Sequence, residues 1–200
     1  MAVPQNKYKN NATVLGIPKS VILEEPPGKK SYLSLEVMCP SKDGSLIAYG
    51  KMRGDENEIK SLEAFVKSNP GSPIKLRGVI TQFKSNEEEG KLLTNYTFFR
   101  WEPAVLAEFK AVFVVRGELL RKNTSNGDGI LTISQLQQGS EQPDELVLYT
   151  SDLKEMNEFK EGTFIELKGR LKAKTPEDEY CEATSSIKPY AERISSVELS

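Results

Sequence analysis

The 200-residue sequence contains no histidine, only two cysteines and a single tryptophan. Histidine is the side chain most often used as a general base, as a zinc ligand and in serine or cysteine triads. The two cysteines, Cys39 and Cys181, lie far apart and form no metal-type pair, so we expect two reduced thiols. The sequence therefore favours a binding protein over an enzyme, with no catalytic residue, no cofactor and no metal.

Long apolar runs are also missing, and none approaches the roughly 20 residues that a membrane helix needs. The first residues, MAVPQNKYKNN, lack the apolar core of a signal peptide. We therefore expect an intracellular, cytoplasmic protein with no membrane contact. Hydrophobic residues make up 38% of the chain, but they recur in short, evenly spaced groups that predict a folded protein.

The first half of the chain has the pattern of a small β domain. We expect strands at residues 13–23, 31–40, 45–52, 72–83 and 91–103. Residues 56–69 have helical spacing instead, with Ile59, Leu62, Phe65 and Val66 on one face. The triplet Asn69-Pro70-Gly71 should end this helix. The predicted order is three strands, a helix and two strands.

The second half repeats this plan. We expect strands at residues 110–122, 130–137, 145–151, 162–174 and 180–194, with a short helix at residues 152–160. The segment GSPIKLRG (71–78) matches GTFIELKG (162–169) at a constant offset, and each follows a predicted helix. This repeat predicts a duplication and two domains, residues 1–103 and 104–200.

Five strands with a helix between the third and the fourth are the plan of the OB-fold, a small closed barrel whose bends favour glycine. In this element order the sequence resembles tandem OB-fold single-stranded-DNA-binding proteins of phages and mobile elements. The resemblance implies a mainly β fold of two five-stranded OB-like barrels. It also implies single-stranded DNA binding with little sequence preference, in support of replication or recombination in a bacterial or phage-infected cell. The last residues, AERISSVELS, depart from the acidic tail with a terminal aromatic that often recruits partners.

Strand alternation predicts which side chains of the first barrel point outward. In the fifth strand we expect Leu93, Phe99 and Trp101 inside, which turns the intervening residues out. The predicted nucleic-acid-binding residues are Tyr32, Tyr49, Lys51, Arg53, Lys75, Arg77, Tyr96, Phe98 and Arg100. Rings can stack on bases and cations can hold phosphates, which suits a single strand.

Two groups within this set differ. Tyr32, Tyr49, Lys51 and Arg53 fall on the second and third strands, which OB-folds commonly use for ligands. Residues 96, 98 and 100 of the fifth strand could equally form an interface between the barrels. Tyrosine is also a favoured strand residue for packing reasons alone, so each single residue has a purely structural interpretation as well.

Charge separates the two halves. Residues 1–103 hold 15 Lys and Arg against 12 Asp and Glu, whereas residues 104–200 hold 12 against 17. The best basic cluster of the second half is Arg116, Arg121 and Lys122, and its third strand offers Tyr149 without a cation. We therefore expect the first half to bind most of the nucleic acid. The acidic half would contact replication or recombination proteins, self-associate into a homo-oligomer or extend the groove weakly.

Two other functions remain open from the sequence. Tandem small β-barrels also serve as adaptors in protein assemblies, and the acidic second half favours this alternative. RNA binding is the third hypothesis, because the predicted fold does not distinguish ribose from deoxyribose.

Overall fold

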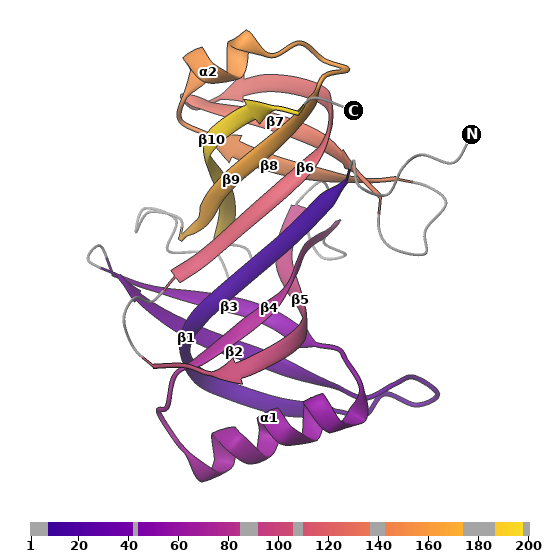
Figure 1. Ribbon diagram of the computed structural model, residues 1–200, viewed down its shortest axis with the longest axis vertical. Coiled ribbons are helices and arrows are strands. Elements are labelled where there is room, and N and C mark those ends of the chain that lie inside the picture. Colours follow the sequence, from indigo (N-terminus) through magenta and orange to yellow (C-terminus); the bar gives the residue numbers. More distant parts are fainter. Residues whose placement is uncertain are drawn as a thin grey trace. The chain divides into compact units, whose positions relative to one another are not determined.

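The computed structural model describes residues 8–41, 44–84, 92–105, 110–136, 143–173 and 187–197. Its strands in the first part of the chain are β1 (Lys9–Glu24), β2 (Tyr32–Ser41), β3 (Gly44–Met52), β4 (Ile74–Lys84) and β5 (Leu92–Pro103), and helix α1 is Glu56–Ser68. Those that follow are β6 (Lys110–Ser125), β7 (Asp128–Gln135), β8 (Asp144–Thr150), α2 (Leu153–Glu158), β9 (Phe164–Ala173) and β10 (Ile187–Ser196). The chain is mainly β, as the sequence predicts (Figure 1).

Contacts divide the chain into two compact units. The first unit comprises residues 12–111 and 173–187, and the second comprises residues 1–11, 112–172 and 188–200. The predicted domains, residues 1–103 and 104–200, remain a prediction. Cys181 and the first seven residues of the predicted strand 180–194 lie outside the described residues, which resume at Ile187.

The first unit is a closed ring of five strands. β1 pairs antiparallel with β2 and with β4, β2 pairs antiparallel with β3, and β4 pairs antiparallel with β5. The ring closes where β3 lies parallel to β5. This order, with α1 between β3 and β4, is the OB-fold expected from the sequence.

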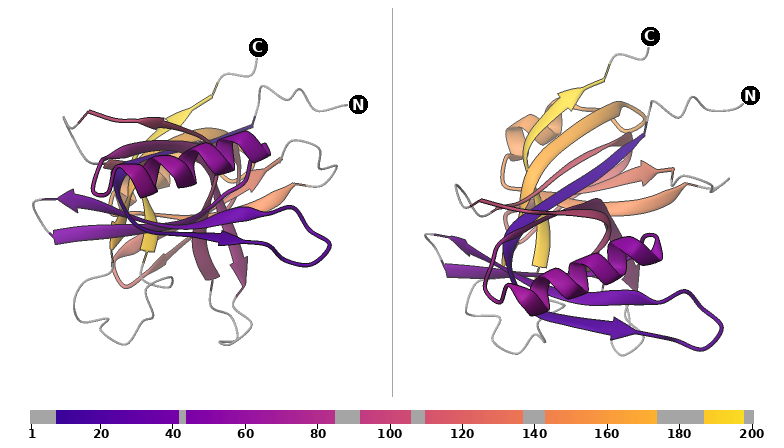
Figure 2. Two further views of the ribbon diagram at one scale, coloured as in Figure 1. Left: turned by 90° about the horizontal axis from the view of Figure 1, so that it is seen from below. Right: turned by 60° about the horizontal axis from the view of Figure 1, so that its bottom comes forward.

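Helix α1 begins and ends where the sequence predicts. The Asp55 carboxylate accepts a hydrogen bond from the Glu58 backbone N–H at 2.9 Å, which caps the first turn. Asn69 ends the helix by donating its backbone N–H to the Phe65 carbonyl oxygen at 2.9 Å. Ile59 and Leu62 are buried, and the helix lies across one opening of the strand ring (Figure 2).

The barrel interior follows strand alternation closely in β2 and β4. Leu33, Leu35, Val37 and Cys39 of β2 are buried, as predicted. Ile74, Leu76 and Ile80 of β4 are also buried. Burial raises the pKa of the Cys39 thiol to about 12, so this cysteine is held as an unreactive core residue. The barrel closes around an apolar core and leaves the alternate side chains outside.

The second unit contains a comparable ring of pairings. β6 pairs antiparallel with β7 and β9, and β7 pairs antiparallel with β8. β10 lies parallel to β8 and beside β9. Helix α2 follows β8, as α1 follows β3, and the Asp152 carboxylate caps it by accepting the Glu155 N–H at 2.8 Å.

The glycines of the repeated octamer occupy matching places. A Cβ on Gly78 of β4 would lie 2.0 Å from the Thr97 carbonyl oxygen of β5. A Cβ on Gly169 of β9 would lie 1.8 Å from the Tyr190 carbonyl oxygen of β10. Only glycine allows such a close approach of two backbones. The offset seen in the sequence therefore corresponds to the same structural requirement in each unit.

Candidate nucleic-acid interface

Tyr32 is the centre of a cluster of one ring and two cations on the outside of the first barrel. The Lys51 Nζ atom lies 4.8 Å from the centroid of the Tyr32 ring, and the Arg53 guanidinium carbon lies 5.5 Å from it. Both distances are within the range of cation–π attraction. Tyr32 and Lys51 are half-buried and Arg53 is exposed, so all three side chains reach solvent.

Strand register explains why these residues meet. Leu33 of β2 lies opposite Met52 of β3, and Ser34 lies opposite Lys51. The same register carries Tyr32 to the level of Arg53, just beyond the end of β3. Residues at one level of paired strands point to the same face. Tyr49 also belongs to β3, opposite Glu36, but its side chain lies outside the described part of the structure.

Lys51 and Arg53 differ from the other predicted cations because neither forms an ion pair within the described residues. Lys75 Nζ lies 2.6 Å and Arg77 Nη2 lies 3.1 Å from the same Glu102 carboxylate. Hydrogen bonds from these two cations hold the pKa of the Glu102 carboxyl below its usual value, so it stays ionised at neutral pH. These two cations are therefore partly neutralised before any ligand arrives.

Arg100 is also paired. Its Nη1 lies 3.0 Å from a Glu58 carboxylate oxygen of helix α1. The neighbouring Trp101 donates its indole N–H to the Ser61 hydroxyl at 3.0 Å, and its ring lies 5.1 Å from that of Phe65. Arg100 and Trp101 thus fasten α1 to β5, which gives Arg100 a structural role on the outside of the barrel.

The prediction that Tyr96 and Phe98 point outward is wrong. Both side chains are buried and their rings stack inside the barrel with centroids 5.2 Å apart. The cause is a β-bulge: Arg77 lies opposite Arg100, but Gly78 lies opposite Phe98, so Phe99 is the extra residue. On the two sides of the extra residue, the alternation of inward and outward side chains has opposite phase. The alternation that holds at the C-terminal end of β5 therefore predicts the wrong side for Tyr96 and Phe98.

The same bulge contradicts the expected interior place of Phe99, which is 45% exposed. Trp101 lies beyond the bulge and opposite the buried Leu76, so its side chain is on the inward side of β5, where it is half-buried against Phe65 of α1. Sequence reasoning therefore missed an aromatic side chain on the outer surface. The available signal was Gly78, because an isolated glycine within a strand pattern often marks a bulge in the pairing.

Two lysines near the cluster were also missed. Lys29 and Lys30 are exposed in the turn between β1 and β2, and Ser31 alone separates them from Tyr32. Gly28 has a φ of 70°, and the Lys29 backbone N–H donates to the Pro26 carbonyl oxygen at 3.1 Å. The loop after the first strand belongs to the usual OB ligand face, so adjacent lysines in a Pro-Gly turn were the usable signal.

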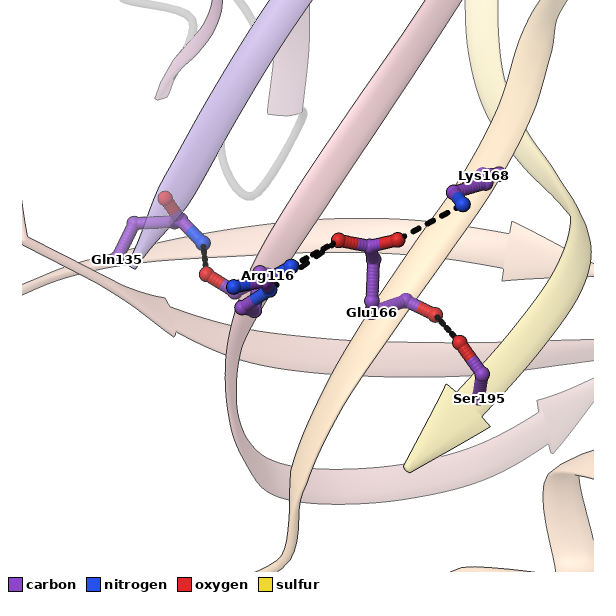
Figure 3. A network of polar contacts seen from close by, with 5 residues as sticks. All are labelled: Arg116, Gln135, Glu166, Lys168 and Ser195. Carbon is purple, nitrogen blue, oxygen red and sulfur yellow. Dashed lines mark hydrogen bonds and ion pairs between the residues drawn. The ribbon is translucent and has the colours of Figure 1, made fainter. Parts of the chain in front are cut away.

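In the second unit, Arg116 of the predicted basic cluster belongs to a network of polar contacts (Figure 3). Arg116 Nη2 lies 2.6 Å from the Glu166 carboxylate, and Lys168 Nζ lies 3.0 Å from its other oxygen. The Gln135 amide donates to the Arg116 carbonyl oxygen at 2.6 Å, and the Ser195 hydroxyl donates to the Glu166 carbonyl oxygen at 3.4 Å. Burial opposes ionisation of Glu166, but hydrogen bonds from Lys168 and Arg116 outweigh it and lower its pKa.

Arg121 and Lys122, the other two cations of the predicted basic cluster, also form contacts within the second unit. Arg121 Nη2 lies 2.5 Å from the Glu145 carboxylate. Lys122 Nζ donates to the Phe159 carbonyl oxygen at 2.8 Å, at the end of helix α2. The predicted basic cluster of the second half therefore serves the fold of its own unit.

Tyr149 has a neighbour in the second unit as well. Its ring lies 5.8 Å from that of Tyr190, and the Tyr190 hydroxyl donates to the Asp128 carboxylate. Burial and the bond to Asp128 raise the pKa of Tyr190.

Within the described residues, no group of three or more histidine, cysteine or acidic side chains is placed to hold a metal ion. In the same residues, no helix combines the length and the apolar character needed to cross a bilayer.

Comparison with known proteins supports the fold. No protein-family model matches the sequence, and no curated protein matches it. Among solved structures, the chain is similar to the single-stranded DNA binding protein from Thermus aquaticus, with a TM-score of 0.67 and 15% sequence identity. The match covers 97% of this chain and 95% of that chain. At this identity the likeness shows a shared fold.

Proposed function

We propose that the protein binds single-stranded DNA through the outer face of β2 and β3. The observation that carries this proposal is the cluster of Tyr32, Lys51 and Arg53, in which two cations without an ion pair in the described residues flank an accessible ring. A flat ring stacks on any base, and a cation attracts any phosphate, so such a cluster binds with little sequence preference. The similarity to the Thermus aquaticus protein supports the same assignment.

The first unit would do most of the binding. Its cluster is free to meet phosphates, whereas Arg116 and Arg121 of the second unit are bound to Glu166 and Glu145. We infer that the chain is a tandem repeat of two OB barrels, because the strand order and the tight glycines recur in the second unit. The chain would act without catalysis, in DNA replication or recombination in the cytoplasm.

The second unit would serve protein contacts, with replication or recombination proteins or with a further copy of the chain. This part of the proposal rests on the net negative charge of the second half of the chain. Arg116 and Arg121, two cations of its predicted basic cluster, are already paired with Glu166 and Glu145. If the first unit also failed to bind nucleic acid, the assembly-adaptor hypothesis would take precedence.

Fluorescence anisotropy with labelled oligo-dT tests the proposal. We expect tight binding at about 50 mM salt that weakens steeply as salt rises, because bound cations displace counterions from the phosphates. A duplex of the same length should bind far more weakly, since its bases are already stacked and unavailable to Tyr32. Oligo-U of equal length separates RNA from DNA as the preferred partner. Absence of oligo-dT binding at low salt would exclude the proposed function.

A further inference from the structure

Phe99 occupies a position on the barrel exterior that the nucleic-acid proposal above does not use. The last described pairs between β3 and β5 are Lys51 with Thr97 and Met52 with Phe98. The next level holds Arg53 and Phe99, and the Arg53 backbone N–H donates to the Phe98 carbonyl oxygen at 2.8 Å, which keeps the two strands together there. Met52 and Phe98 are buried, so the following residues face outward.

The register of β2 places Tyr32 at the same level. Leu33 lies opposite Met52, so the preceding residue of β2 lies opposite the residue after Met52. Tyr32, Arg53 and Phe99 therefore form one row across three neighbouring strands, with Arg53 on the central strand and its guanidinium 5.5 Å from the centroid of the Tyr32 ring. Neighbouring strands lie about 4.8 Å apart, which puts the backbones carrying the two rings about 10 Å from each other.

The exposure of Phe99 follows from the bulge. Phe99 has no partner on β4, because the pairing passes from Arg100 directly to Phe98. Gly78 makes this passage possible, since any Cβ there would meet the Thr97 carbonyl oxygen and the Phe98 Cα atom. A large aromatic side chain is thereby left 45% exposed beside a cation that forms no ion pair in the described residues.

We propose that Phe99 is a second base-stacking platform, so that two neighbouring nucleotides of single-stranded DNA stack on Tyr32 and Phe99 while Arg53 holds the phosphate between them. The proposal rests on the proposed function and deepens it, because it defines the path that the DNA strand follows across β2, β3 and β5. Charge complementarity selects this ligand: the cation between the rings favours an anionic partner that also carries flat apolar groups.

Variants of Phe99 test the platform. F99L keeps apolar volume but removes the flat ring, and it should weaken oligo-dT binding about 5-fold to 160-fold, the range for loss of one base stack. F99W should bind at least as tightly as the wild type. The dependence of affinity on salt should stay unchanged in both, because no cation is removed. V105A is the matched control at another exposed apolar position, and it should bind like the wild type.

A second ligand separates stacking from structural damage. An oligonucleotide of abasic deoxyribose phosphates offers phosphates without rings, so the wild type and F99L should bind it equally. If F99L loses affinity for both ligands alike, Phe99 acts on the fold and the platform proposal is wrong. The platform proposal is also wrong if F99L lowers the mass of the protein in analytical ultracentrifugation but leaves its affinity for oligo-dT unchanged, because Phe99 would then contact a second copy of the chain.

The remaining outcomes distinguish the two proposals. If the wild type binds oligo-dT and F99L binds it with the same affinity, only the platform is overturned and the Tyr32 cluster stands. If the wild type binds no oligo-dT, the proposed function and the platform are both overturned.

Discussion

The Lys51 ammonium lies 4.8 Å from the centre of the Tyr32 ring, and the two residues come from neighbouring strands of a closed barrel. The cation keeps the ring in place on the outer face, while the ring leaves the ammonium accessible to a further anion. This pair is the smallest unit that contains both chemistries needed for a single strand, a surface for a base and a charge for a phosphate.

Replacing Tyr32 should separate the ring from its hydroxyl. Y32F retains the stacking surface and should bind oligo-dT like the wild type. Y32L should lose about 1–3 kcal/mol of binding free energy, because the base stack and the cation–π contacts disappear together. Titration of labelled oligo-dT by anisotropy measures both variants.

The matched control for Y32L is Y149L in the second unit, where the tyrosine ring lies 5.8 Å from that of Tyr190. It should change affinity less than Y32L does. Equal losses of oligo-dT affinity in Y32L and Y149L would mean that both units bind the DNA strand alike, which would contradict the proposal that the first unit does most of the binding.

The phenol of Tyr96 is buried, and its hydroxyl finds no hydrogen-bond partner within the described residues. Y96F keeps the stack with Phe98 and removes an unsatisfied polar group. Its free energy of unfolding should therefore equal that of the wild type or exceed it by about 1 kcal/mol. Urea unfolding followed by the fluorescence of Trp101, which lies in the same unit, measures this change.

The same substitution should alter the response to alkali. Burial raises the pKa of Tyr96 well above 10, so the unfolded chain releases this proton at a lower pH than the folded chain does. The wild type should then lose stability as pH rises above about 10, and Y96F should lose less. A Y96F variant that is clearly less stable at neutral pH would show that the hydroxyl has a partner after all.

Glu166 should make the second unit sensitive to acid. Its folded pKa is lowered, so its contribution is present above its unfolded value and is lost as pH falls through the folded pKa. E166Q should unfold more easily at neutral pH by about 1–3 kcal/mol, because Arg116 and Lys168 lose their charged partner. Its stability should also vary less than that of the wild type as pH falls below about 4.3, the usual pKa of an unfolded glutamate.

Circular dichroism during urea titration measures this effect, while Trp101 fluorescence reports on the first unit separately. The matched control is E145Q, whose exposed pair with Arg121 should contribute less than about 1 kcal/mol. An acid response in E166Q as steep as that of the wild type would assign the effect to other carboxylates.

Much of the fold was predictable because alternation is a local property. The inward side chains of β2, the helix from Glu56 to Ser68 and the order of elements in the first unit agree with the sequence pattern. Alternation failed in β5, where one extra residue turns Phe99 outward and Tyr96 and Phe98 inward. A bulge depends on the partner strand, so the pattern of β5 alone does not contain it.

The candidate site was predictable to a similar degree. Tyr32, Lys51 and Arg53 were chosen from the strands that OB-folds commonly use, and the structure brings them together. The ion pairs of Lys75, Arg77 and Arg100 depend on cross-strand register and on the position of α1. Sequence alone shows which residues are charged, whereas pairing decides which charges remain available for a ligand.

The most direct measurement is the salt dependence of oligo-dT affinity in the double variant K51A/R53A. Each phosphate contact of a single strand adds about 0.7 to the slope of log affinity against log salt. The double variant should bind more weakly and with a slope smaller by about 1.4. The control K75Q/R77Q, in which both cations already share Glu102, should change the slope less. An unchanged slope in K51A/R53A, or a larger change in K75Q/R77Q, would show that the strand binds elsewhere.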